Sequence, residues 1–65
     1  MNGYYLEQVK RLVAWAEKSN IGRTEILKNH CADFIKESFP DASELEVIGL
    51  YFSYLEWRKE QLKLN

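Results

Sequence analysis

Helix-breaking residues stand at only two places in this chain, and their positions restrict its fold more than any other feature. The first break is the segment 19–22, which reads Ser-Asn-Ile-Gly, and the second is the segment 39–41, which reads Phe-Pro-Asp. Between the breaks, apolar residues recur at the three- and four-residue spacing of amphipathic helices. The sequence therefore predicts an all-α fold, a small three-helix bundle with helices over roughly 4–18, 23–38 and 42–63.

Each of the first two predicted helices carries one apolar stripe that we expect to face a shared core. The stripe of the first helix consists of Tyr5, Val9, Leu12, Val13 and Ala16. The stripe of the second consists of Leu27, Cys31, Phe34 and Ile35. Asp41 is a predicted N-cap of the third helix, with Glu44 completing a capping box, and Ser43 with Glu46 offers the same pair two residues later.

The third predicted helix is apolar around more than half of its circumference. Its apolar residues are Leu45, Val47, Ile48, Leu50, Tyr51, Phe52, Tyr54, Leu55, Trp57 and Leu62. Two short helices cover so wide a face poorly, so we expect one side of it to form a dimer interface. That side carries Val47, Leu50, Tyr54 and Trp57. The alternative is a helix wedged between the other two, with Tyr54 and Trp57 half exposed.

A chain of 65 residues supports one helical domain, spanning 1–65, and small cores barely offset the conformational entropy lost on folding. Cys31 is the only cysteine and cannot form an internal disulfide, so oligomerisation is the expected source of extra stability. The most economical oligomer is a homodimer. The lone cysteine, the lack of a signal-peptide pattern at the start and the lack of a membrane-spanning apolar run favour a cytoplasmic protein that does not enter a membrane.

The sequence offers little catalytic or metal-binding chemistry. His30 and Cys31 are adjacent, so on a helix their side chains diverge by about 100° and do not act on one ion or one substrate together. The glutamates of the third helix have the spacing of caps and of a solvated face. We therefore expect a protein that is not an enzyme and that uses neither a cofactor nor a metal.

A second surface signal lies on the first helix, opposite its apolar stripe. Tyr4, Arg11 and Trp15 fall on one line there and have the composition of an interaction hot spot. These three residues are the predicted contact site for a protein partner. The alternative is that Trp15 folds onto Arg11 or tucks under the third helix.

The segment 16–27, Ala-Glu-Lys-Ser-Asn-Ile-Gly-Arg-Thr-Glu-Ile-Leu, resembles the junction between the two helices of ribbon-helix-helix DNA-binding proteins. The resemblance covers residues 9–36. It implies a symmetric dimer with Arg23, Thr24 and Lys28 near DNA phosphates. The family reads DNA bases with an N-terminal strand, whereas only residues 1–3 precede the first helix here. A helix-turn-helix arrangement, with the helix from Arg23 as the reading helix, is an equally open interpretation.

Nine Lys and Arg against ten Asp and Glu give a net charge of −1, which is not the excess of positive charge typical of a nucleic-acid-coating protein. The sequence favours a small non-catalytic regulator or inhibitor that acts by protein–protein contact, as a dimer. Its size and chemistry favour an origin in a phage or other mobile element. The alternative is a DNA-binding transcriptional regulator of the ribbon-helix-helix or helix-turn-helix type.

Overall fold

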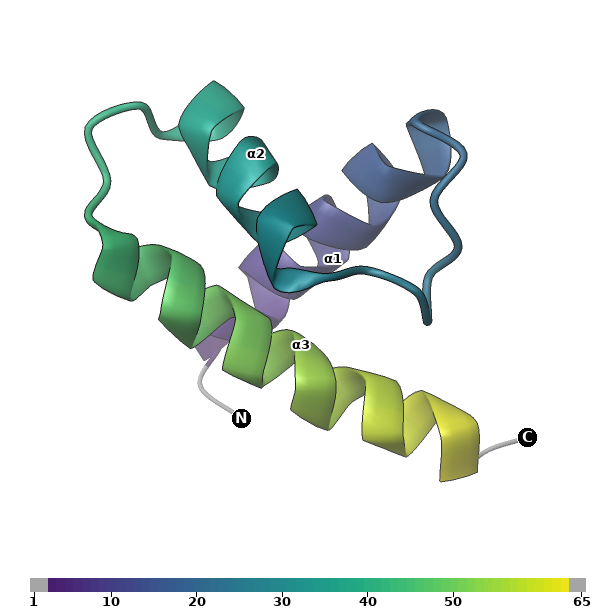
Figure 1. Cartoon of the computed structure of the whole chain (residues 1–65). Helices are drawn as coiled ribbons and strands as arrows, with labels where there is room; N and C mark the ends of the chain where they lie inside the picture. The colour runs from purple at the N-terminus through teal and green to yellow at the C-terminus, as the bar shows by residue number, and fades with distance from the viewer. Residues whose placement is uncertain (1–2, 64–65) are drawn as a thin grey trace.

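The computed structural model describes residues 3–63 and contains three α-helices in that range. They are α1 (Gly3–Lys18), α2 (Lys28–Ser38) and α3 (Glu44–Lys63). In the view of Figure 1, α3 runs along the lower edge of the molecule, α2 lies above it and α1 passes behind both. The predicted all-α three-helix bundle is thereby confirmed.

The first break ends α1 through backbone hydrogen bonds. Asn20 adopts a positive φ of 62°, a left-handed conformation that asparagine tolerates better than most residues. The carbonyl of Ala16 then accepts the N–H of Ile21 at 2.9 Å, and that of Glu17 accepts the N–H of Asn20 at 3.1 Å. These two bonds form a Schellman motif, and they satisfy carbonyls that the helix end leaves free.

The second helix begins at Lys28, so the predicted start at residue 23 is wrong. Residues 22–25 form a turn, in which the N–H of Glu25 bonds the carbonyl of Gly22 at 2.9 Å. Ile26 follows with a fully buried side chain. The backbone of residues 23–26 bonds side chains of α3 and not its own helix. Tertiary contacts therefore override a sequence that would otherwise propagate a helix.

Helix α2 starts without one of the usual N-cap residues. Leu27 occupies the cap position with an extended backbone, φ −103° and ψ 167°. Its N–H donates to Nδ1 of His30 at 2.9 Å, and the N–H of His30 donates back to the carbonyl of Leu27 at 3.0 Å. His30 thus fills the place that Glu or Gln takes in a capping box.

The second break is a turn followed by the start of α3. The N–H of Ala42 bonds the carbonyl of Phe39 at 2.9 Å, with Pro40 in the position of the turn that its ring favours. Because residues 39–42 belong to this turn, α3 begins at Glu44 and not at residue 42. Ser43 therefore precedes the helix, which agrees with the later of the two predicted starts.

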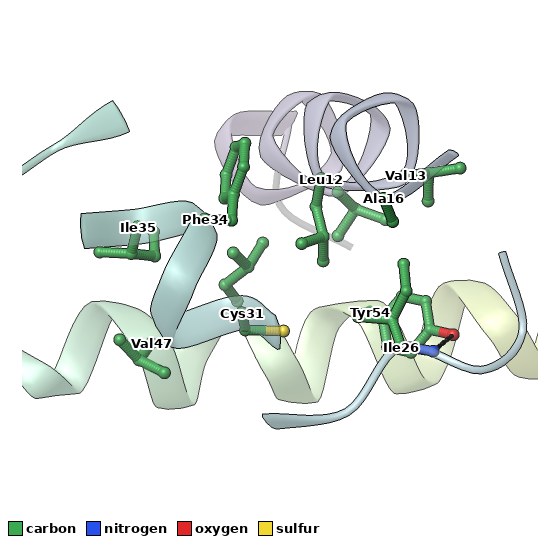
Figure 2. Close-up of a cluster of buried hydrophobic side chains, with 11 residues drawn as sticks. Leu12, Val13, Ala16, Ile26, Cys31, Phe34, Ile35, Val47 and Tyr54 are labelled. Carbon is green, nitrogen blue, oxygen red and sulfur yellow. Dashed lines mark hydrogen bonds between the residues drawn. The ribbon is translucent and has the colours of Figure 1, made fainter. Parts of the chain in front are cut away.

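The core lies where all three helices meet. Its buried members are Val9, Leu12, Val13, Ala16, Ile26, Cys31, Phe34, Ile35, Val47, Leu50 and Tyr54. Figure 2 shows Leu12 of α1 pointing down between Cys31 of α2 and Tyr54 of α3. The N-terminal half of α1 also approaches α3 closely. A Cβ on Gly49 would lie 2.6 Å from the hydroxyl oxygen of Tyr5, so glycine leaves the room that this approach needs.

Candidate functional site

Helix α3 is apolar on two opposite faces, and one of them belongs to the core. Val47, Leu50 and Tyr54 are buried within the single chain, and Trp57 is half-buried with its ring stacked on Tyr54 at 6.1 Å. The prediction that these four residues form a dimer interface is therefore corrected. The apolar stripes of α1 and α2 pack over these four residues. This side of α3 therefore holds the bundle together.

The hydroxyl of Tyr54 anchors the α1–α2 linker to this core face. It donates to the carbonyl of Arg23 at 2.6 Å and accepts the N–H of Ile26 at 3.2 Å, and Figure 2 shows the second bond as a dashed line. Arg58 lies over the Tyr54 ring, 5.8 Å from its centroid, and donates to the carbonyl of Thr24 at 3.4 Å. Burial raises the pKa of the Tyr54 hydroxyl above its ordinary value, more than the backbone bond and the Arg58 charge lower it.

The opposite face of α3 presents a line of large apolar side chains to solvent. Leu45 is 75% exposed, Phe52 64% and Leu62 56%, and Ile48 and Leu55 are half-buried between them. Steps of three and four residues separate these positions, with Lys59 in the one polar place. We call this line, Leu45, Ile48, Phe52, Leu55, Lys59 and Leu62, the outer seam.

The spacing of the outer seam is the a and d pattern of a coiled coil. A helix with such a seam on one side normally packs it against another helix. Within residues 3–63, α2 lies above α3 and α1 passes behind it (Figure 1), and of the outer-seam residues only Leu55 packs against the core. Among the described residues, the core therefore leaves Leu45, Phe52 and Leu62 of the outer seam exposed, and it touches the seam at Leu55.

The charges along α3 differ between its two ends. Glu44 and Glu46 stand in the first turn, and Lys63 stands in the last turn, 3.6 Å from Glu60. This distribution is favourable for the helix dipole, which is positive at the N-terminus and negative at the C-terminus. It also makes one end of the outer seam acidic and leaves Lys59 and Lys63 at the other.

The predicted partner site on α1 is divided in the structure. Trp15 is half-buried between α1 and α2, where its ring meets Phe34 edge-on at 5.8 Å and its Nε1 donates to Oε2 of Glu37 at 2.8 Å. The expectation that Trp15 points outward is therefore wrong, because Phe34 and Glu37 of α2 draw the indole inward. Arg11 is exposed and pairs with Glu7 at 3.9 Å, and Tyr4 is 53% exposed.

The predicted DNA-contacting residues do not share a helix. Arg23 and Thr24 lie in the linker, whereas Lys28 is the first residue of α2. The guanidinium of Arg23 pairs with Glu17 at 3.3 Å, and Thr24 is half-buried. Glu25 is exposed beside them. The linker thus presents acidic and basic groups together.

The chemistry of the buried thiol is that of a core residue. Cys31 is fully buried, and burial raises the pKa of its thiol from 9.0 to about 11. Nδ1 of the adjacent His30 is engaged with the N–H of Leu27. Within residues 3–63, no group of three or more His, Cys, Asp or Glu is placed to hold a metal ion. None of the helices in that range combines the length and the apolar composition of a membrane-spanning segment.

An open groove of about 600 Å³ runs between α2 and the start of α3. Ala32, Ile35, Phe39 and Val47 form its floor, and Lys28 and Lys36 are among the residues at its rim. Its apolar floor consists of residues that belong to the core or pack against it. None of the outer-seam residues lines this groove, and its lining holds no cluster of reactive groups.

No protein-family model matches this chain, and the searches of curated proteins and of solved structures likewise find no match.

The apolar members of the outer seam belong to the broad apolar face that the sequence predicts for the third helix. The predicted interface, however, lies on the side of that face that carries Leu50 and Tyr54. The core face, Val47, Leu50, Tyr54 and Trp57, has the same three- and four-residue steps, so the spacing alone does not tell the two faces apart.

Proposed function

We propose that this chain is a small non-catalytic regulator or inhibitor that acts by binding another protein through the outer seam of α3. The observation that carries the proposal is the alignment of Leu45, Phe52 and Leu62, each more than half exposed, along one side of a helix. Large contiguous apolar strips on small proteins mark surfaces that bind other proteins. The heptad-like spacing indicates that the bound element is itself a helix.

The non-catalytic part of the proposal depends on the state of the two most reactive side chains. The Cys31 thiol is buried and has a raised pKa, so it is a poor nucleophile at neutral pH. The Nδ1 lone pair of His30 accepts a backbone hydrogen bond. Neither residue faces the outer seam, since both belong to α2.

Binding to DNA has weaker support from the same structure. Arg23 is paired with Glu17, and Glu25 adds a second carboxylate close to the phosphate-binding position that the resemblance implies. A net charge of −1 gives no general attraction to a polyanion. A duplex-binding titration at low salt tests this alternative, because even non-specific binding is detectable there.

The test of the proposed function uses two photo-crosslinking variants in the cells that encode the chain. A benzoyl-phenylalanine at Phe52 probes the outer seam, and the same residue at Tyr4, a similarly exposed aromatic on α1, serves as the matched control. We expect position 52 to capture a different protein and position 4 to capture none above background. Capture from position 4 alone, or from neither position, contradicts the proposal.

The captured protein is then purified and its affinity for the chain measured. Leu45→Glu should weaken binding at least about tenfold, because it places a charge in an apolar contact. Leu27→Glu is the control, since Leu27 is 57% exposed but lies outside α3. Equal affinities for the two variants would show that the outer seam is not the binding surface.

A further inference from the structure

We infer that the outer seam of α3 is covered, in the purified protein, by the outer seam of a second copy of this chain in antiparallel orientation. The inference rests on the proposed function in that both take this face to be a protein-binding surface. It names the occupant and its direction, neither of which the proposed function requires.

The spacing of the outer seam is the first argument for a second copy. Apolar residues at positions 45, 48, 52, 55 and 62 follow the a and d places of two and a half heptads. The seam packs best against a helix with the same repeat, and a second copy of α3 carries that repeat. The core face, with Leu50 and Tyr54, lies on the opposite side, so pairing of two outer seams leaves each bundle intact.

The arrangement of residues along the outer seam favours the antiparallel direction. When the two helices run in opposite directions, Leu45 faces the partner's Leu62 and Phe52 faces the partner's Leu55. Lys59 then faces the partner's Ile48, along which its aliphatic stem packs while the ammonium group reaches water. In the parallel direction, Lys59 faces the partner's Lys59 inside the seam, and this like-charge contact is unfavourable.

Charge complementarity supports the same direction. The antiparallel pairing that sets Leu45 against the partner's Leu62 also brings the acidic first turn of each helix to the end of the partner helix that carries Lys59 and Lys63. By symmetry the same juxtaposition occurs at both ends of the seam. The two helix dipoles also run in opposite directions, so the positive N-terminal end of each helix lies beside the negative C-terminal end of the other.

The area of the outer seam agrees with a dimer of modest affinity. Eighteen residues at 1.5 Å per residue extend about 27 Å, and with the flanking side chains of both chains the contact buries on the order of 1,000 Å². That area is near the lower limit for a specific protein interface, below the standard size. We therefore expect association in the micromolar range and not an obligate dimer.

Sedimentation of the purified chain tests the inference directly. At about 500 μM we expect a dimer of twice the 7.7 kDa chain mass, dissociating on dilution. Phe52→Glu should remain monomeric at that concentration with unchanged helix content, and Leu27→Glu should dimerise like the native chain. Lys59→Leu should tighten the dimer at least about tenfold, since it completes the apolar seam. A native monomer at about 500 μM, or a dimer unaffected by Phe52→Glu, overturns the inference.

The direction is measured with a spin label on Lys63→Cys. In an antiparallel dimer the two labels lie near opposite ends of the paired helices, roughly 30 Å apart. In a parallel dimer they lie at the same end, within about 15 Å of each other. The buried Cys31 thiol, with its raised pKa, should react too slowly to be labelled. The short distance contradicts the antiparallel arrangement.

The outcomes of the two sets of experiments are independent. A monomeric native chain that is still captured from position 52 in cells overturns the inference and leaves the proposed function standing. A dimer that responds to Phe52→Glu, with only the chain itself captured in cells, supports the inference and contradicts binding of a different protein. When the inference and the proposed function both hold, the other protein replaces the second copy on the outer seam.

Discussion

Removal of one buried oxygen atom, by Tyr54→Phe, is the sharpest test of how α3 holds the bundle together. The Tyr54 hydroxyl is the link between the core face of α3 and the linker, through the carbonyl of Arg23 at 2.6 Å and the N–H of Ile26 at 3.2 Å. Phenylalanine keeps the ring and its stacking on Trp57. The substitution therefore isolates the two hydrogen bonds.

The expected loss in the free energy of unfolding follows from the fate of the two backbone groups. The carbonyl of Arg23 lies near the surface and regains a bond to water, so its loss costs about 1 kcal/mol. The N–H of Ile26 is in a buried bond and stays unsatisfied, which costs about 1–3 kcal/mol. The sum, roughly 2–4 kcal/mol, is a large part of the total stability of about 3–10 kcal/mol expected for a domain of this length.

Urea unfolding followed by circular dichroism measures this loss, and amide hydrogen exchange at Ile26 locates it. Tyr51→Phe is the matched control, because Tyr51 is half-buried on the same helix and its hydroxyl makes no hydrogen bond among residues 3–63. We expect the control to change stability by less than about 0.5 kcal/mol. A Tyr54→Phe protein as stable as the control, with Ile26 still protected, would refute the anchoring role of this hydroxyl.

Three further predictions concern other buried or capping groups. Burial raises the pKa of Cys31 to about 11, so between pH 9 and 11 the unfolded chain loses this proton while the folded chain largely retains it. The free energy of unfolding should therefore fall by up to about 2 kcal/mol over that range. The raised pKa of Tyr54 acts in the same direction, and Cys31→Ala should reduce the fall in urea unfolding across that range. His30→Ala should lower the free energy of unfolding by about 1 kcal/mol, and His30→Gln should lower it much less because glutamine also accepts the Leu27 N–H. Equal losses for the two variants in thermal melts would argue against the capping role of His30. Gln8→Met should stabilise the fold by about 1 kcal/mol, because Oε1 of this buried side chain has no hydrogen-bond partner in the described chain. A destabilised variant would show that a bound water satisfies Oε1 of Gln8.

The helix order and most of the core were predictable from the sequence because they depend on local periodicity. Val9, Leu12 and Phe34 lie at helical spacing between two clear breaks, and the structure buries all three. The start of α2 was not predictable in this way. Residues 23–26 have no strong breaker, and they leave the helix because Tyr54 and Arg58, about thirty positions away, bond their backbone.

Local sequence patterns also do not predict which face of α3 is the open one. Both faces of this helix are apolar, and only the packing of α1 and α2 shows that Leu50 and Tyr54 are on the covered side and Phe52 on the open one. The position of Trp15 has a similar cause. Its indole turns inward because Phe34 and Glu37 on α2 lie within reach, which no spacing along α1 reveals.

Dilution of the isotope-labelled chain, followed by amide chemical shifts, tests most directly the claim that α3 has one face for the core and one for binding. Between about 1 mM and about 20 μM, shifts should change at Leu45, Phe52 and Leu62 and along the rest of the outer seam, while the Ile26 and Leu50 amides stay constant. Shifts that change at Trp15 and Tyr4 instead would contradict the assignment of self-association to the outer seam, and shifts that change nowhere over this range would contradict the pairing of two copies.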